Sequence, residues 1–334
     1  MTDQRSIIIF NHAISSQATK KSYFYQLKRF KEFYKIRDYD SLIAIEPKKL
    51  QVMIEDFIMN RSSKLESGSL RHSLSALELF FSMNDIVLNW KKSKKLIPKQ
   101  ERKKSGMKAY SVDDVRELIK SCKTYLHEVL IYVIASSGVR VGFVEDLRIK
   151  HLKDMPMGCK AITVHADTVY EHTTFMTPES FVFITEKRRC YNAVILSTQL
   201  NRIARDSNIV RTKTHKNRYD IMSAHGLRKF FNTTLKLNQN LNPAIIERLL
   251  SHKSNSIPLD SSYFQPTEKD LFEVYQKAIQ SLTIDKSSRL EFELEENKER
   301  LEKLENSKDR RILELESDVR LIKEFAKSIR KESS

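Results

Sequence analysis

Glycine and proline are scarce in this chain, with 6 and 7 residues among 334. Both interrupt helices, and sheet-rich or low-complexity chains use them more often. Hydrophobic residues make up 40% of the sequence, which is enough to form a buried core. No apolar run is long enough to suggest a membrane span. The sequence therefore predicts a mainly helical protein, with room for two domains and an appendage.

The net charge of +16 is unevenly distributed along the chain. Residues 286–334 contain 13 basic and 13 acidic side chains, so the whole excess lies before this segment. A basic body suits a polyanionic partner such as DNA or RNA, whereas a balanced tail suits contact with protein. Charge alone is weak support for this interpretation, because many soluble proteins are basic without binding nucleic acid.

The cysteines indicate a reducing compartment. Cys122, Cys159 and Cys190 are widely spaced and form no CxxC pair, so we expect neither a disulfide framework nor a metal site. The apolar run Ile7–Phe10 is too short for the core of a signal peptide. We therefore expect a cytoplasmic protein without a membrane partner.

Residues 1–90 are expected to form a small helical bundle. Apolar residues recur at spacings of three and four after Ser16 and Thr19, and the opposite face is rich in lysine and arginine. Further helical patterns run over Leu50–Met59 and Leu70–Phe81. The first pattern comprises Tyr23, Leu27, Phe30, Phe33 and Tyr34.

Residues 91–108 contain nine Lys or Arg and a single acid, Glu101. Their apolar periodicity is weak, which is typical of a solvated linker. The alternative is a linker that also lies along a DNA backbone, where each neutralised phosphate releases counterions.

Residues 109–285 predict a mostly helical domain with a small antiparallel sheet, hence an α+β fold. Ser111 should cap one helix, and a buried helix over Leu126–Ser136 should end at Ser137-Gly138. The β-like stretches are Ala161–His165, Thr173–Met176, Phe181–Thr185 and Ala193–Leu196.

Residues 286–334 form a charged helical tail with a possible coiled coil. One heptad set is mostly apolar, and the second is half polar, so the seam should be short or marginal. The alternatives are self-association or packing on the body, and a lone charged helix. The sets are Leu294, Leu301, Lys308, Leu315, Ile322 and Ile329, and Leu290, Asn297, Leu304, Arg311, Asp318 and Phe325.

Several side chains suit phosphodiester chemistry, which without a metal requires a nucleophile, cations for the non-bridging oxygens and an acid for the leaving alkoxide. Arg140 follows an apolar helix and a Ser-Gly break, where an arginine needs a partner or a function. The ordinary role there is a salt bridge to Glu145 or Asp146. His225 and Arg228 are three residues apart, and so lie on one helix face.

Two further candidates follow in the chain. His252 lies just past an amphipathic helix, where C-capping is the ordinary role. Tyr263 lies in a polar segment before the next helix. Tyrosine is a poor nucleophile at its usual pKa near 10, so a working tyrosine belongs beside cations that lower the pKa. Each candidate is weak alone.

The order of these candidates is more informative than any one of them. Arg, His-x-x-Arg, His and Tyr, in this order, resemble the signature of the tyrosine recombinase (phage-integrase) family, and the likeness extends over nearly the whole chain. The segments that carry it are SSGVR, HGLRKFFNT, LLSHKS and SSYFQPT. Two of them look particularly like archaeal integrases, and residues 1–90 resemble the family's core-binding domain.

The resemblance implies specific roles. Arg140 and Arg228 would clamp the scissile phosphate, His225 would assist proton transfer, and His252 would bond a non-bridging oxygen. Tyr263 would form a 3′-phosphotyrosyl link and release a 5′-hydroxyl, without cofactor or metal. The family's partners are a double-stranded DNA attachment or core site and further copies of the chain, typically as a tetramer. A nucleoid-associated enzyme of a mobile element is the corresponding expectation.

The sequence departs from the family pattern at two points. Many members carry an acid three residues after the first arginine, where this chain has Phe143. The family's general-acid lysine lies in a turn between strands. Lys187 fits if FVFITEKRRCYNAVILS is strand, turn and strand, but HADTVYEHTTF could be the turn instead, and it contains no lysine.

We therefore expect a site-specific DNA recombinase, the integrase of a mobile element or virus. The alternatives are a type IB topoisomerase with a similar site, a DNA-binding protein with a decayed site, and a basic helical RNA-binding protein. The ordered motif set disfavours the last of these.

Overall fold

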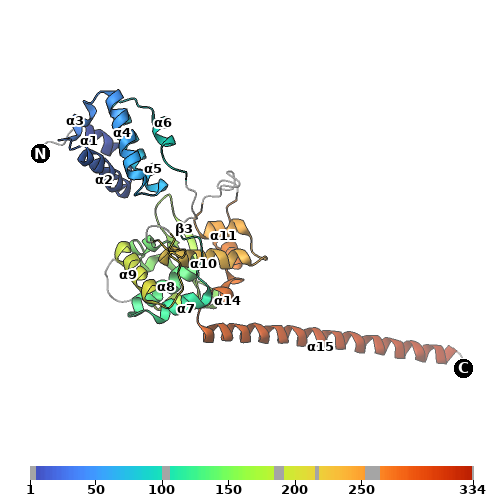
Figure 1. Cartoon of the computed structure of the whole chain (residues 1–334). Coiled ribbons are helices and arrows are strands. Elements are labelled where there is room, and N and C mark those ends of the chain that lie inside the picture. The colour runs from blue at the N-terminus through green and yellow to red at the C-terminus, as the bar shows by residue number, and fades with distance from the viewer. Residues whose placement is uncertain (1–4, 100–105, 184–191, 215–217, 253–263, 333–334) are drawn as a thin grey trace. The chain divides into compact units, whose positions relative to one another are not determined.

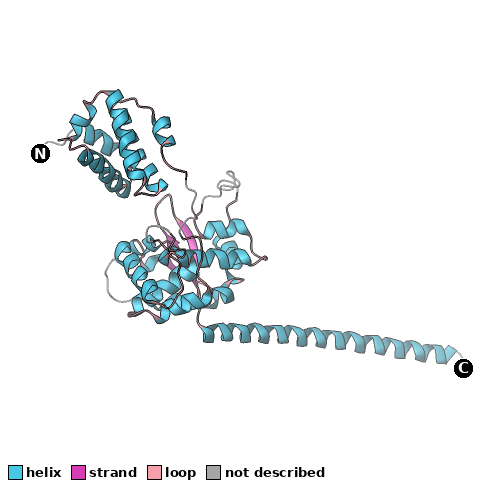
Figure 2. Ribbon diagram, viewed as in Figure 1, coloured by secondary structure: helices cyan, strands magenta, loops and turns pink. Residues whose placement is uncertain are grey.

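The computed structural model describes residues 5–99, 106–183, 192–214, 218–252 and 264–332. The chain forms two compact units, residues 1–102 and 103–334, and each encloses its own hydrophobic core. Helices predominate in both units, and the second contains a three-stranded antiparallel sheet (Figure 1 and Figure 2). The predicted fold class is confirmed.

The first unit is a helical bundle. Ser16 caps its second helix by accepting a hydrogen bond from the backbone of Thr19, as its position before the apolar repeat predicted. Aromatic rings fill the centre, and Phe30 contacts Phe57 and Phe81 edge to face. The helices are α1 (Arg5–His12), α2 (Gln17–Phe33), α3 (Tyr39–Ile43), α4 (Pro47–Ser62), α5 (Ser67–Met83) and α6 (Trp90–Lys95).

Helix α6 lies in the segment that we expected to be a solvated linker. The ring of Trp90 stacks on Phe81, and Lys92 pairs with an acid of α4, its Nζ lying 2.8 Å from Glu55 Oε2. At the other end, Lys108 pairs with Asp220 at 2.8 Å. Both ends of the basic segment therefore belong to folded units, which the weak apolar periodicity did not reveal.

The second unit is built around a buried helix. Helix α8 (Tyr125–Ser137) is hydrophobic on nearly all sides, and it ends at Gly138, whose φ is +67°. Ser111 caps α7 in a capping box with Asp114. Both features were predicted from the sequence. The remaining α-helices are α7 (Val112–Lys120), α9 (Ala193–Asp206), α10 (Ser223–Leu237), α11 (Pro243–Leu249), α13 (Glu268–Gln276), α14 (Ile279–Leu282) and α15 (Lys286–Glu332).

The sheet contains strands β1 (Leu152–Asp154), β2 (Lys160–Val164) and β3 (His172–Met176) in that order. Strands β2 and β3 form an antiparallel hairpin in which Val164 pairs with His172. Two predicted strands are wrong. Residues 181–183 belong to the 3-10 helix η4 (Pro178–Phe183), and residues 193–196 form the first turn of α9.

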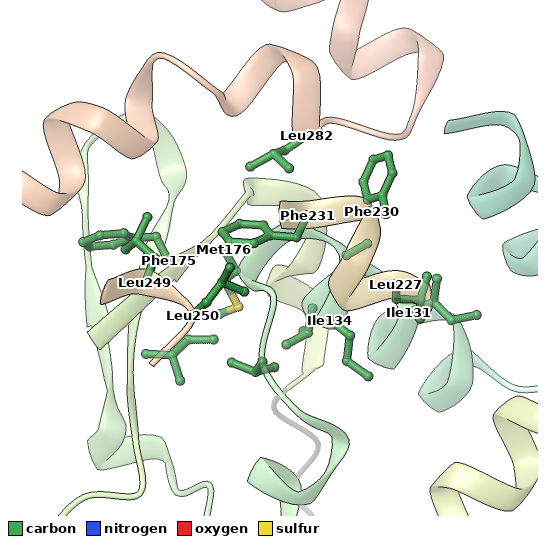
Figure 3. Packing of buried hydrophobic residues seen from close by; sticks show 14 of the residues in the cluster. Ile131, Ile134, Phe175, Met176, Leu227, Phe230, Phe231, Leu249, Leu250 and Leu282 are labelled. Atoms are coloured by element: carbon green, nitrogen blue, oxygen red, sulfur yellow. The ribbon is translucent and has the colours of Figure 1, made fainter. Parts of the chain in front are cut away.

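The core of the second unit joins elements that are far apart in the sequence. Figure 3 shows α8, β3, α10, α11 and α14 contributing side chains to one cluster. Helix α10 packs against α8, and α11 packs against β3. The loops that follow α8 and α11 are therefore held by a common core, and they lie beside α10 and the β2–β3 hairpin.

Helix α15 continues the tail as a single helix, and several of its described leucines are exposed, including Leu294, Leu301 and Leu315. Within the described ranges, no helix combines the length and apolar character that crossing a bilayer requires.

Candidate active site

The loop after α8 presents Arg140. Gly138 turns the chain in the left-handed region, and a side chain there would collide with Phe231, because an added Cβ would lie 2.4 Å from Phe231 Cδ1. The carbonyls of Ser136 and Ser137 accept hydrogen bonds from Tyr275 and Thr174, at 2.9 and 2.8 Å. These bonds fix the backbone that leads to Arg140, whose side chain is exposed.

Arg140 does not use the partners proposed for it. Glu145 Oε1 accepts a hydrogen bond from the backbone of Ala193, and Asp146 lies 3.6 Å from His165 Nδ1. Within the described part of the chain, no ion pair joins Arg140 to either acid. Phe143, which stands at the family's acid position, is buried in the core. The guanidinium is therefore not committed to a structural salt bridge with these acids.

Helix α10 carries His225 and Arg228 on one face, as the spacing predicted. Arg228 is only 5% exposed, and two backbone carbonyls hold its guanidinium. Nη1 donates to Gly138 O at the end of α8, and Nη2 donates to Leu250 O at the end of α11. Nη2 also lies 3.0 Å from His252 Nε2. The guanidinium thus joins the loops that follow α8 and α11.

The turn after α11 places His252. The backbone N–H of His252 donates to Glu247 O at 2.9 Å, and that of Ser251 donates to Arg248 O at 2.8 Å, which is the Schellman pattern. Ser251 occupies the left-handed position with φ +52°. The turn brings His252 Nδ1 within 2.6 Å of Glu247 Oε2. The expected C-capping role of His252 is therefore filled by its backbone N–H, whereas its side chain contacts the Glu247 carboxylate.

The contacts of His252 determine its tautomer. Arg228 can only donate, so His252 Nε2 accepts and the proton of the neutral ring is on Nδ1, directed at Glu247. The second oxygen of Glu247 contacts Lys236. Burial tends to raise the pKa of Glu247, but the bonds from Lys236 and His252 outweigh it and lower the pKa. A charged carboxylate thus orients the imidazole.

The electrostatics of the cluster favour an anion. Burial, and then the charge of Arg140, lower the pKa of Arg228 to about 10. Burial lowers the pKa of His225 as well, with contributions from Lys229, Arg228 and Arg140. These groups disfavour one another's charged forms, and Glu247 offsets only part of this repulsion at Arg228. A bound phosphate would relieve it.

The β2–β3 hairpin adds a histidine that the sequence analysis missed. His172 is half-buried, and the charges of Arg228 and Arg140 contribute to lowering its pKa after burial and the neighbouring His165. The sequence signal for it was the alternative in which HADTVYEHTTF, a segment without lysine, forms the turn between two strands. The structure places a hairpin there, whereas the competing strand-turn-strand reading around Lys187 is wrong. Lys187 and Tyr263 lie outside the described residues.

The arrangement can bind a phosphodiester and move protons. Two guanidinium groups supply charge and directed donors, and histidines from α10, the α11 turn and β3 supply ring nitrogens that can donate or accept protons. The structure brings Arg140, His225, Arg228 and His252 into one region, although they span more than a hundred positions of the sequence.

A scan against protein-family models finds no match, and a search of curated protein sequences finds none either. Solved structures do match. Lambda integrase in a tetramer bound to a Holliday junction aligns at 13% identity, over 75% of this chain and 76% of that one, with a TM-score of 0.56. A lambda integrase fragment bound to DNA aligns at 13% identity, over 80% and 97%, with a TM-score of 0.55.

The Tn1549 transposon integrase, in complex with a circular intermediate DNA, aligns at 13% identity, over 81% of this chain and 99% of that one, with a TM-score of 0.52. At these identities the likeness concerns the fold. This chain has the fold of integrases, as its resemblance to the tyrosine recombinases predicted.

Proposed function

We propose that this protein is a site-specific DNA recombinase that cuts and rejoins DNA by metal-free transesterification. The observation that carries the proposal is the burial of Arg228 beside Arg140 and three histidines, with its guanidinium held by two carbonyls and, among the residues that the structure describes, by no carboxylate. A buried cation without a carboxylate ion pair is costly, and a phosphate ligand would compensate it. The integrase fold and the basic body support DNA as the source of that phosphate.

In the proposed reaction Tyr263 attacks the scissile phosphorus and forms a 3′-phosphotyrosyl link. Arg140 and Arg228 stabilise the charge that develops on the non-bridging oxygens. His225 accepts the phenolic proton, because burial and then the charge of Lys229, which is not part of the proposed clamp, lower its pKa and favour the neutral ring. His252, oriented by Glu247, donates to a non-bridging oxygen after Nε2 takes up a proton and gives up its contact with Arg228. The link conserves the energy of the phosphodiester, so religation requires no nucleotide cofactor.

The test is covalent capture. Duplexes that the protein selects from a random-sequence pool are rebuilt as nicked suicide substrates, which release the short cleaved strand and so trap the adduct. We expect an adduct on Tyr263, identified by mass spectrometry, and none with Tyr263→Phe. An adduct on Tyr191 would refute the assignment of Tyr263 as the nucleophile. If neither the wild type nor Tyr263→Phe formed an adduct, the protein would instead be a DNA-binding protein with a decayed site.

A relaxation assay separates the recombinase from a type IB topoisomerase. A plasmid that lacks the selected sequence should stay supercoiled with the recombinase, because its cleavage depends on site recognition. Preference for RNA over the selected duplex in competition would instead favour the RNA-binding alternative.

We propose further that the protein acts as an assembly on DNA, with the nucleoid as its place of action, and that α15 contributes to self-association. The exposed leucines of α15 support this proposal, since at least part of the apolar heptad set faces solvent in the single chain. Leu294→Asp with Leu301→Asp should lower the mass of the full-length protein measured by light scattering. An unchanged mass, in a sample shown to be oligomeric before substitution, would exclude α15 from the contact.

A further inference from the structure

The turn of the β2–β3 hairpin carries two histidines, which are candidate proton donors for the proposed cleavage reaction. Residues 165–171 contain no lysine, and His165 and His172 lie at the two ends of the turn. Their ring centroids are 6.5 Å apart. The turn is held by its own side chains, since the backbone N–H of Asp167 donates to Glu171 Oε2 at 2.7 Å and Thr168 Oγ1 donates to His165 O at 2.7 Å.

The ring of His172 is oriented by its backbone. Nδ1 lies 3.1 Å from the carbonyl oxygen of Tyr170, which can only accept, so Nδ1 carries a proton and donates. The neutral ring therefore has its lone pair on Nε2, and the doubly protonated ring has a transferable proton there. His165 differs, because its Nδ1 lies 3.6 Å from Asp146.

Strand β3 ties His172 to the loop that carries Arg140, because Thr174 Oγ1 donates to Ser137 O at 2.8 Å. The surroundings of His172 also allow its protonation to follow the ligand. Burial, then His165 of the same hairpin, Arg228 of α10 and Arg140 after α8 all lower its pKa, whereas the bond to Tyr170 raises it. Every titratable or charged group among these causes is a cation or becomes one. A phosphate bound to Arg140 and Arg228 offsets their charge, and so favours the second proton on His172 at the moment when substrate is present.

We propose that His172 donates the proton to the leaving 5′-oxygen, in the role for which the sequence suggested Lys187. This inference rests on the proposed function. The bond between the Tyr263 oxygen and phosphorus forms while the bond between phosphorus and O5′ breaks. The phenolic proton passes to His225, and the Nε2 proton of His172 passes to O5′. Religation reverses both transfers, and no oxidant, reductant or metal takes part.

A substrate with sulfur at the bridging 5′ position tests the proton transfer, because a thiolate leaves without being protonated. His172→Asn is the principal variant, since the asparagine amide can still donate to Tyr170 O while Nε2 is lost. On ordinary DNA we expect cleavage by His172→Asn to be slower by about 100-fold or more. On the sulfur-bridged duplex it should cleave within about threefold of wild type.

Matched variants separate proton donation by His172 from a general loss of activity. His165→Asn, at the other end of the same turn, should change cleavage of both duplexes by the same factor. A defect of His172→Asn that sulfur does not rescue would overturn the proposal, as would a sulfur-rescued defect of Lys187→Ala with His172→Asn near wild type. Wild-type protein that forms no adduct on either duplex would instead refute the proposed function, so the two failures are distinguishable.

Discussion

Replacing Arg228 with lysine keeps the positive charge and removes the planar fork, so it separates the two tasks of this residue. The guanidinium donates to carbonyls at the ends of two different helices, through two different nitrogens. A lysine has one terminal nitrogen, so at least one buried carbonyl is expected to lose its partner. An unpaired buried polar group costs about 1–3 kcal/mol.

We therefore expect Arg228→Lys to lower the free energy of unfolding by about 2 kcal/mol, which corresponds to a fall in Tm of about 4–8 °C for a unit of this size. Arg140→Lys is the matched control, because Arg140 is exposed and a surface substitution should change stability by less than about 0.5 kcal/mol. Both variants should lose adduct formation by about 100-fold or more, since each removes a guanidinium from the proposed phosphate clamp.

Urea unfolding followed by circular dichroism measures the stability, and the suicide substrate measures the adduct. If Arg228→Lys were as stable as wild type, the carbonyl bonds would not be holding the site together. If Arg140→Lys were destabilised as strongly as Arg228→Lys, the structural distinction between the two arginines would be wrong. If both variants lost activity but neither lost stability, the proposed phosphate clamp would still hold, and only the structural role of Arg228 would be refuted.

Three further predictions concern the turns and histidines of the site. Gly138→Ala should destabilise the protein by about 2 kcal/mol or more, as measured by urea unfolding, because its φ of +67° is unfavourable for alanine and the new Cβ would overlap Phe231. Ser251→Gly should stabilise it by about 0.5–1 kcal/mol in the same assay, since glycine adopts φ +52° without strain; a loss of stability would contradict this account of the turn. Stability should fall as the pH drops from 7 to 5.5, because the pKa of His172 and of His225 is lowered in the folded protein and the unfolded chain binds these protons first. Unfolding of His172→Asn at both pH values should show a shallower dependence, and an unchanged slope would argue against the low pKa of this histidine.

The fold was predictable where periodicity and capping act together, and less so where a short apolar run was read alone. Ser111 marked the start of α7 correctly, and the Ser137-Gly138 break marked the end of α8. The run beginning at Ala193 resembles a strand, but Asn192 caps it by accepting from the backbone N–H groups of Val194 and Ile195. The apolar positions that continue into α9 bury one face of a helix, and this longer pattern decides the structure.

The candidate site, like the fold, was predictable only in part. The order of the motifs was enough to nominate Arg140, His225, Arg228 and His252 together, and the structure brings these four into one region. His172 was not nominated, because the sequence left two candidate hairpins open, and which of them lies near the arginines is a property of the tertiary structure. Glu247 was hidden for a similar reason, since only the Schellman turn brings its carboxylate to a residue five positions later.

The way Arg228 is held explains how the site can be ready for an anion before one arrives. A carboxylate would satisfy the guanidinium more strongly, but it would also neutralise the charge and compete with phosphate for the same donors. Backbone carbonyls satisfy the donors without a net charge. Those of Gly138 and Leu250 lie at the C-terminal ends of helices, where the helix dipole places partial negative charge. Among the described residues, Glu247 is the acid whose charge acts on Arg228, and it contacts His252 rather than the guanidinium, so the cation keeps its attraction for a phosphate.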